Sequence, residues 1–178
     1  GLATANSLAA LKSGVGEIQC TINGLGERAG NASLEEIVMA ILTKQDNYNC
    51  KTNINTKELR GISKMVSEFS GFSVSPNKAI VGKNAFRHGS GIHQDALIKS
   101  PKNYEFFSPE LVGATQELIV GPHSGRNGLN ARLKKLGIDV TSSQLIKIYD
   151  ELMNNNSQKK EFQDKDLLKV MKNYSIEK

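Results

Sequence analysis

The segment EIQCTINGLGERAGNASLEE, residues 17–36, passes from an alternating pattern through a glycine-rich loop into a helical pattern. Polar and apolar side chains alternate strictly over Glu17–Ile22, which predicts a β-strand. Ser33, followed three residues later by Glu36, predicts a helix start with a capping box. The next apolar positions share one helical face: Leu34, Ile37, Val38, Ile41 and Leu42. A strand, a loop and a helix in this order predict a βα unit.

The flanking segments continue this alternation. An alanine-rich opening predicts a helix that stops at Ser13-Gly14, and residues 51–55 fit a short strand. A further helix is predicted from Asn55 or Thr56 to Gly71, with an inward stripe of Leu59, Ile62, Met65, Val66 and Phe69. Strands alternating with helices predict an α/β class with a parallel sheet. Two such units cannot close a sheet, and a (β/α)₈ barrel takes about 250 residues.

The pattern of predicted elements changes after residue 72, where regular alternation of strands and helices ends. All four prolines fall within residues 73–125, where short extended pieces are predicted at 79–81 and 117–120. Ser108-Pro109 predicts a helical turn with proline at its first position. Three helices are then predicted: the first begins at Ser124, the second is capped by Thr141 together with Gln144, and the third begins shortly before Leu167. We therefore divide the chain into residues 1–72, a mixed connector at 73–137 and a small helical subdomain at 138–178.

The composition narrows the class of protein and its partners. Of 178 residues, 38% are hydrophobic and 23% charged, and no apolar run approaches the about 20 residues that span a bilayer. The net charge of +5 is concentrated in residues 41–140, but no nucleic-acid-binding motif accompanies it. An anionic small molecule fits this charge at least as well. Cys20 and Cys50 form neither a disulfide framework nor a zinc motif, which favours a reducing, cytoplasmic setting without membrane or nucleic-acid partners.

The loop at residues 23–31 is the first candidate site. Its glycines at 24, 26 and 30 match neither the dinucleotide fingerprint nor the P-loop. Glu27, Arg28 and Asn31 supply a carboxylate, a cation and a hard amide oxygen, and such an oxygen suits Mg²⁺ or Mn²⁺. The same residues also fit an ordinary tight βα loop that contains an internal Glu–Arg pair.

Two later segments are further candidates. Residues 87–95, RHGSGIHQD, place His93 on a glycine-flanked loop beside an acid, which suits a general base as well as an ordinary surface histidine. Residues 121–126, GPHSGR, predict a helix start at which backbone N–H groups and Arg126 would bind an anion, or simply a helix N-cap. Tyr104 carries no functional indication by itself.

Taken together and in this order, five motifs resemble those of the 2-isopropylmalate synthases and their relatives, the homocitrate and citramalate synthases. The motifs are at residues 23–31, 76–82, 90–95, 104–113 and 123–126. The resemblance covers essentially the whole chain. It implies the last βα units of a (β/α)₈ TIM barrel, followed by a mixed connector and a small helical subdomain. It also implies a homodimer that exchanges subdomains and condenses acetyl-CoA with a 2-keto acid on a divalent metal.

The resemblance assigns roles residue by residue. It implies that Asn31 associates with the metal, which would be Mn, Mg or Zn, and that Glu27 is an active-site carboxylate. It implies that His93, together with Tyr104, assists removal of a proton from the acetyl methyl group. Two further residues are implied to lie near the substrate, Ser90 and Arg126.

The resemblance also shows what this sequence lacks. In the family an HxHND metal motif precedes a Gly-x-Ala stretch like Gly1-Leu2-Ala3, and an earlier strand carries an acidic ligand and a catalytic arginine. The residues that choose the keto acid have no counterpart here, and nothing after Lys178 resembles a leucine-sensing domain. We therefore expect a later part of a longer enzyme that is inactive alone.

The predicted activity is condensation of acetyl-CoA with 2-ketoisovalerate in leucine biosynthesis. Two alternatives remain open at this point. One is homocitrate or citramalate synthase activity, and the other is a non-catalytic fragment that acts by association.

Overall fold

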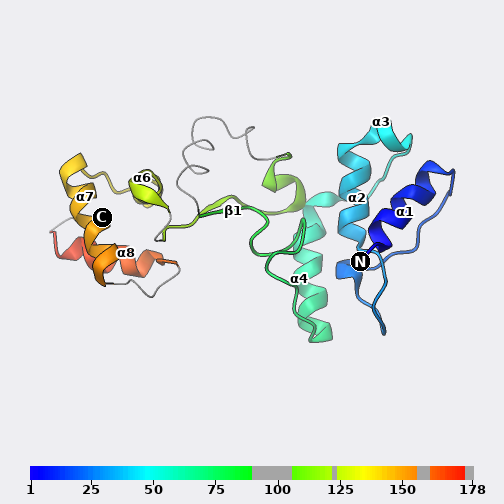
Figure 1. Cartoon of the computed structure of the whole chain (residues 1–178), viewed down its shortest axis with the longest axis horizontal. Coiled ribbons are helices and arrows are strands. Elements are labelled where there is room, and N and C mark those ends of the chain that lie inside the picture. The colour runs from blue at the N-terminus through cyan, green and yellow to red at the C-terminus, as the bar shows by residue number, and fades with distance from the viewer. Residues whose placement is uncertain (90–105, 122–123, 156–160, 175–178) are drawn as a thin grey trace. The chain divides into compact units, whose positions relative to one another are not determined.

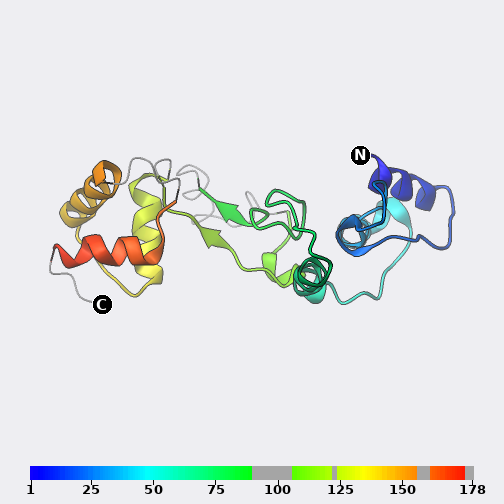
Figure 2. The same cartoon turned by 90° about the horizontal axis from the view of Figure 1, so that it is seen from below.

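The computed structural model describes residues 1–89, 106–121, 124–155 and 161–174. The chain forms two compact units. Unit 1 consists of Gly1–Phe86 and Phe107–Thr115, and unit 2 consists of the described residues of Arg87–Phe106 and Gln116–Lys178. Figures 1 and 2 show the elements of each unit from two directions.

Unit 1 is built from helices. Its α-helices are α1 (Ala3–Lys12), α2 (Leu34–Thr43), α3 (Gln45–Tyr48) and α4 (Leu59–Ser70), and its 3₁₀ turns are η1 (Ile22–Gly24), η2 (Thr56–Glu58) and η4 (Pro109–Val112). The predicted opening helix is confirmed and ends before Gly14. Helix α2 contacts α1 and η1 and buries Ile37, Val38, Met39 and Ile41, so it supplies both apolar clusters of this unit.

The predicted strands of unit 1 are wrong. Residues 17–20 and 51–55 have no regular structure, and Thr21 forms only an isolated parallel bridge to Ser33. Thr21 donates to the Ala32 carbonyl at 3.0 Å, and its own carbonyl accepts from Leu34 at 2.9 Å. A parallel strand needs the backbone of a neighbouring strand. Among the described residues, the start of α2 is the backbone partner of this segment, so one bridge forms in place of a ladder.

Helix α4 also differs from its predicted packing. It ends at Gly71, which has φ +74°, as the sequence predicts. Leu59 is 2% exposed, but Met65 is 53% and Phe69 87% exposed, so most of the predicted inward stripe faces solvent in the described structure. The side that α4 does bury includes Ser63. The apolar spacing correctly predicts a helix but not which part of its surface this chain covers.

Unit 2 combines a short parallel ladder with three helices. Strand β1 (Arg87–His88) pairs with β2 (Glu117–Leu118), and the helices are α6 (Gly125–Lys135), α7 (Ser142–Asn155) and α8 (Asp164–Lys172). The predicted capping box of α7 is confirmed, because Thr141 and Gln144 each accept a hydrogen bond from the other's backbone N–H. The helices share a core that includes fully buried Leu129, Leu133, Ile148, Leu152 and Leu167.

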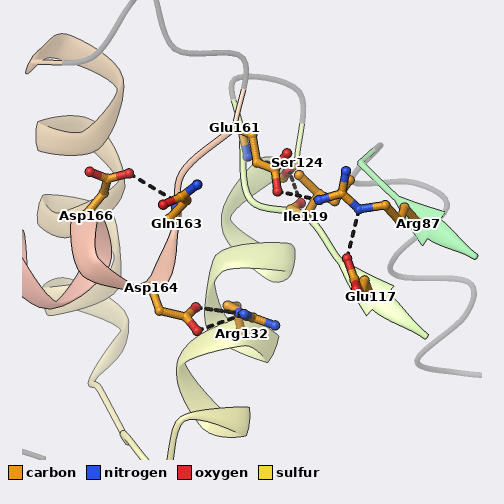
Figure 3. A network of polar contacts seen from close by, with 10 residues as sticks. Arg87, Glu117, Ile119, Ser124, Arg132, Glu161, Gln163, Asp164 and Asp166 are labelled. Carbon is orange, nitrogen blue, oxygen red and sulfur yellow. Dashed lines mark hydrogen bonds and ion pairs between the residues drawn. The ribbon is translucent and has the colours of Figure 1, made fainter. Parts of the chain in front are cut away.

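Ion pairs connect the start of α8 and the residues just before it to other elements of unit 2 (Figure 3). Arg87 pairs with Glu117 at 2.8 Å and with Glu161 at 2.5 Å, and Arg132 forms a two-pronged pair with Asp164. The extended piece predicted at 117–120 is confirmed in part by β2. The piece predicted at 79–81 is wrong, since this segment is a turn in which Ile80 has φ +68°.

Candidate active site

The loop at residues 23–31 begins with two residues in left-handed conformation. Asn23 has φ +61° and Gly24 has φ +69°. Asparagine is one of the few non-glycine residues that tolerate this region. The backbone N–H of Asn23 donates to Oε2 of Glu35 at 3.0 Å, so the first residue of the loop is attached to the first turn of α2.

The loop closes on itself at Gly26. The Nδ2 group of Asn31 donates to the Leu25 carbonyl at 2.9 Å. A Cβ atom at position 26 would lie 2.5 Å from Nδ2 of Asn31 and 3.0 Å from the Arg28 carbonyl oxygen. Glycine is therefore required for this closure. Because the amide nitrogen of Asn31 is engaged, its amide oxygen is the atom suited to a metal or polar ligand.

A cavity of about 390 Å³ lies beside this loop. Glu27 and Arg28 contribute charged side chains to its lining, and Lys78 contributes a third. Val66, Phe72 and Val74 supply apolar surface on the side of α4 and the segment after it. Both Glu27 and Arg28 are exposed residues of this lining. The lining thus combines charged and apolar residues.

A polar network lies at the start of α2. The ammonium of Lys78 donates to Ser33 Oγ at 2.8 Å and to Glu36 Oε1 at 2.5 Å, and it pairs with Glu35 Oε1 at 3.4 Å. Thr4 Oγ1 donates to the other oxygen of Glu36 at 2.7 Å. The predicted capping box between Ser33 and Glu36 is therefore wrong, because these side chains bind the ammonium instead of the free backbone N–H groups of the helix.

The loop is also attached to α4. Nδ2 of Asn23 donates to the Ser63 carbonyl at 3.0 Å, and the Ser63 hydroxyl donates to Oδ1 of Asn23 at 2.5 Å. Together with the bond to Glu35, these contacts satisfy the side chain and the backbone N–H of Asn23. The start of the loop is thereby held from two helices.

Two ionisable groups near the loop have shifted pKa values. Burial alone would raise the pKa of Glu36, but hydrogen bonds from Lys78 and Thr4 and the charge of Lys78 outweigh it and lower this pKa. For Cys20, burial first and the nearby carboxylate of Glu35 second raise the pKa of the thiol. Cys20 is thus held as a neutral thiol, in agreement with an inert structural role.

The remaining predicted site residues do not lie at this loop in the described structure. Ser90, His93 and Tyr104 lie outside the described residues. Arg126 is exposed in the first turn of α6, in unit 2. The buried hydroxyl of Ser124, just before α6, donates to the Ile119 carbonyl at 2.7 Å and accepts from the Gly121 N–H at 2.8 Å. It stabilises the preceding chain without capping the helix.

Sequence reasoning missed the residues that support the loop. Lys78 belongs to the motif at residues 76–82, but the motif itself indicates no role for it, and the patterns that contain Asn23 and Glu35 indicate none for these residues. Two features would have identified them. A lone lysine precedes the apolar run Ala79-Ile80-Val81, and two adjacent acids open α2. A lysine whose side chain is removed from water requires an acidic partner.

The described residues contribute one candidate metal ligand rather than a complete site. Among them, no three His, Cys, Asp or Glu side chains are close enough to hold a metal ion together. Asn31 is that candidate, because its side-chain amide is oriented by the hydrogen bond to Leu25 and its amide oxygen is the kind of ligand that divalent cations such as Mg²⁺ bind. No helix within the described ranges is long and apolar enough to cross a membrane.

Two family models match successive parts of the chain. Residues 1–66 match the model described as HMGL-like, and residues 80–160 match the one described as homocitrate synthase post-HMGL domain-like. The first match contains α1, the candidate loop and α2, and it supports the predicted TIM-barrel family for this region. The second match begins within the motif that contains Lys78 and extends through α6 and α7.

Curated proteins are similar over most of the chain. The 2-isopropylmalate synthase of Rhodopirellula baltica is 52% identical over 96% of this chain and 33% of its own length. That of Carboxydothermus hydrogenoformans is 51% identical over 96% of this chain and 34% of its own length, and that of Nitrosococcus oceani is 54% identical over 81% and 28%. The chain spans about a third of the length of these relatives. Residues 1–66 and 80–160 match in the order expected from the motifs, and nearly the whole chain is similar to a part of the 2-isopropylmalate synthases.

Proposed function

We propose that the protein carrying this chain condenses acetyl-CoA with 2-ketoisovalerate, the acyltransferase reaction of leucine biosynthesis. The observation that carries the proposal is identity of about half over nearly the whole chain to several proteins named 2-isopropylmalate synthase. The candidate loop supports the proposal, since Glu27 and Arg28 line a partly apolar cavity. Such a cavity suits a branched keto acid.

The proposed chemistry requires proton removal from the acetyl methyl group and attack of the resulting enolate on a ketone carbon. The proton acceptor would be His93, assisted by Tyr104, as the family resemblance implies. A neutral imidazole is suited to this step at neutral pH. Fixed positive charge stabilises an enolate oxygen or a keto-acid carboxylate, and Arg28 supplies such charge at the cavity.

Four further residues complete the proposed assignment. Glu27 is the active-site carboxylate of the loop, while Ser90 and Arg126 bind substrate. Asn31 would contribute its amide oxygen to a divalent metal, either Mn, Mg or Zn, together with ligands from elsewhere in the protein. When bound, such a metal polarises the keto group and chelates the substrate carboxylate.

The proposal extends to the assembly. The protein would be a cytoplasmic homodimer in which the connector of one subunit reaches the barrel of the other. Residues 1–72 would form the last βα units of the barrel, residues 73–137 the connector and residues 138–178 the helical subdomain. Acetyl-CoA and the keto acid would be its partners, and the basic middle of the chain would favour the phosphates of coenzyme A.

The experiment is a coenzyme A release assay on the full protein that carries this chain. Acetyl-CoA is supplied with 2-ketoisovalerate, 2-ketoglutarate or pyruvate, with and without Mn²⁺, Mg²⁺ or Zn²⁺. We expect the highest kcat/KM with 2-ketoisovalerate, and no turnover by the 178-residue chain alone. The variant His93→Ala should lower kcat far more than it raises the KM for the keto acid.

The results separate the alternatives. A preference for 2-ketoglutarate or pyruvate would replace the proposal by homocitrate or citramalate synthase activity. Lack of metal-dependent coenzyme A release with every keto acid would contradict an acyltransferase. Light scattering on the same preparation would then test the remaining alternative, a non-catalytic protein that acts by associating with other subunits.

A further inference from the structure

Lys78 lies among three oxygen acceptors at the start of α2. Its ammonium is 2.8 Å from Ser33 Oγ, 2.5 Å from Glu36 Oε1 and 3.4 Å from Glu35 Oε1, and its side chain is only 18% exposed. The ammonium donates hydrogen bonds to Ser33 and Glu36, whereas its contact with Glu35 is an ion pair, because the buried Oε1 of Glu35 accepts no hydrogen bond in the described structure.

Polar contacts lead from Lys78 to the candidate loop. Glu35, which pairs with Lys78 through Oε1, accepts the Asn23 N–H through Oε2 at 3.0 Å. Asn23 is the first residue of the loop that carries Glu27 and Arg28. Lys78 itself lines the same cavity as Glu27 and Arg28. The ammonium is thus connected to the loop through Glu35 and shares its cavity.

The charge of Lys78 is needed because Glu35 is buried. Glu35 is 1% exposed, and a buried carboxylate without a cation is strongly unfavourable. Without the ammonium, Glu35 must take up a proton or move toward water. Either change weakens the contact that orients the backbone of Asn23.

We propose that Lys78 is a positioning residue of the candidate active site, which through Glu35 and Asn23 fixes the loop that presents Glu27 and Arg28 to the cavity. Lys78 touches no reacting atom in this role. The inference rests on the proposed function for its kinetic consequence, while its consequence for the loop can be measured without activity.

The test compares Lys78→Met with Lys83→Met in the full protein that carries this chain. Lys83 is an exposed lysine five residues further along the same segment, and it makes a matched control. We expect Lys78→Met to lower kcat about tenfold or more, as loss of supporting residues commonly does, with little change in the KM for acetyl-CoA. Lys83→Met should leave both constants unchanged.

A second comparison tests the route through Glu35. The variant Glu35→Gln removes the charge but keeps an oxygen acceptor for the Asn23 N–H. If Lys78 acts through Glu35, the double variant should lose no more kcat than Lys78→Met alone, because coupled residues do not contribute independently. Fold losses that multiply would overturn this route.

Amide exchange gives a readout that does not depend on turnover. Lys78→Met should speed exchange at Asn23 and along the loop, whereas Lys83→Met should not. Equal exchange in the two variants, or a kcat of Lys78→Met matching that of Lys83→Met, would overturn the proposal. If Lys78→Met does not fold, Lys78→Gln replaces it, with the same expectations, because a neutral amide can still donate to Ser33 and Glu36 but does not supply the charge that Glu35 requires.

The two proposals fail in different ways. A wild-type protein that releases no coenzyme A counts against the proposed function alone, provided that exchange at the loop still responds to Lys78→Met. An active wild-type protein with an insensitive loop counts against the role of Lys78 alone.

Discussion

Arg87 pairs with Glu161, 74 residues further along the chain, at 2.5 Å, and also with Glu117 on the adjacent strand at 2.8 Å (Figure 3). The arginine side chain is 11% exposed, whereas the carboxylates are 39% and 46% exposed. Their removal from water is therefore incomplete, and the pairs are screened by salt. The Phe162 N–H, next to Glu161, donates to the Val120 carbonyl at 2.7 Å.

We expect Arg87→Met to lower the free energy of unfolding of unit 2 by about 1 kcal/mol and to speed amide exchange at Phe162. The difference from wild type should shrink in 1 M salt, at which the Debye length falls to about 3 Å. The control is Lys64→Met, since the Lys64–Glu68 pair lies on the surface of α4 and is largely exposed. A loss that persists unchanged at high salt would show that packing of the arginine stem, rather than charge, holds this segment.

The variant Gly26→Ala tests the closure of the candidate loop. The new Cβ would approach Nδ2 of Asn31 to 2.5 Å, so the bond from Asn31 to the Leu25 carbonyl must break or lengthen. We expect faster amide exchange over residues 23–31 and a lower kcat in the full protein. In the matched variant Gly16→Ala nothing lies within 4 Å of the added Cβ, and both measurements should match wild type. A wild-type exchange pattern in Gly26→Ala would mean that the loop does not require this contact.

Helix α4 provides a test of which apolar residues stabilise the chain. Leu59 is 2% exposed, and Leu59→Ala should cost about 2–5 kcal/mol in the free energy of unfolding. Phe69 lies on the same helix at 87% exposure, so Phe69→Ser should change this free energy by less than about 0.5 kcal/mol. Urea unfolding of both variants and of wild type measures these free energies. A large loss in Phe69→Ser would show that its side chain is covered in solution.

The lowered pKa of Glu36 predicts a pH dependence of stability. A carboxyl group whose pKa is lower in the folded than in the unfolded chain contributes stability above its unfolded pKa. This contribution is lost as the pH falls from the ordinary value of 4.5 through the lowered folded value. We expect wild type and Glu36→Gln to differ most in melting temperature near pH 6 and to converge in strong acid. Glu58→Gln, at an exposed position, should follow wild type throughout.

The sequence predicts the helices of this chain well because their patterns are local. The stop at Gly71 and the reciprocal capping of Thr141 and Gln144 each depend on a few neighbouring residues. The strand predicted at residues 17–22 fails for a different reason. Alternation describes the two faces of a strand, but the ladder requires a backbone partner, and Thr21 finds only the start of α2.

The candidate site likewise combines features that depend on neighbouring residues with features that depend on distant ones. The loop residues Glu27, Arg28 and Asn31 follow from chemistry and family resemblance, and the structure places the first two at a cavity. The support from Lys78 and Glu35 was not predictable from spacing. These residues are 43 positions apart in the sequence, and Ser33 with Glu36 matched a local capping pattern instead. Long-range pairing of charges outweighed a local motif.

The division into two units has a consequence for dissection of the chain. Unit 1 includes Phe107–Thr115, a segment that returns after Arg87 has already entered unit 2. A Cβ at Gly113 in this segment would lie 2.1 Å from the Lys57 carbonyl oxygen, so the returning backbone sits directly against η2. No single cut therefore separates the two units from each other. A truncation after Phe86 removes part of the core around Val112 and Ala114, and recombination of homologous genes at one crossover would exchange mismatched halves of that core.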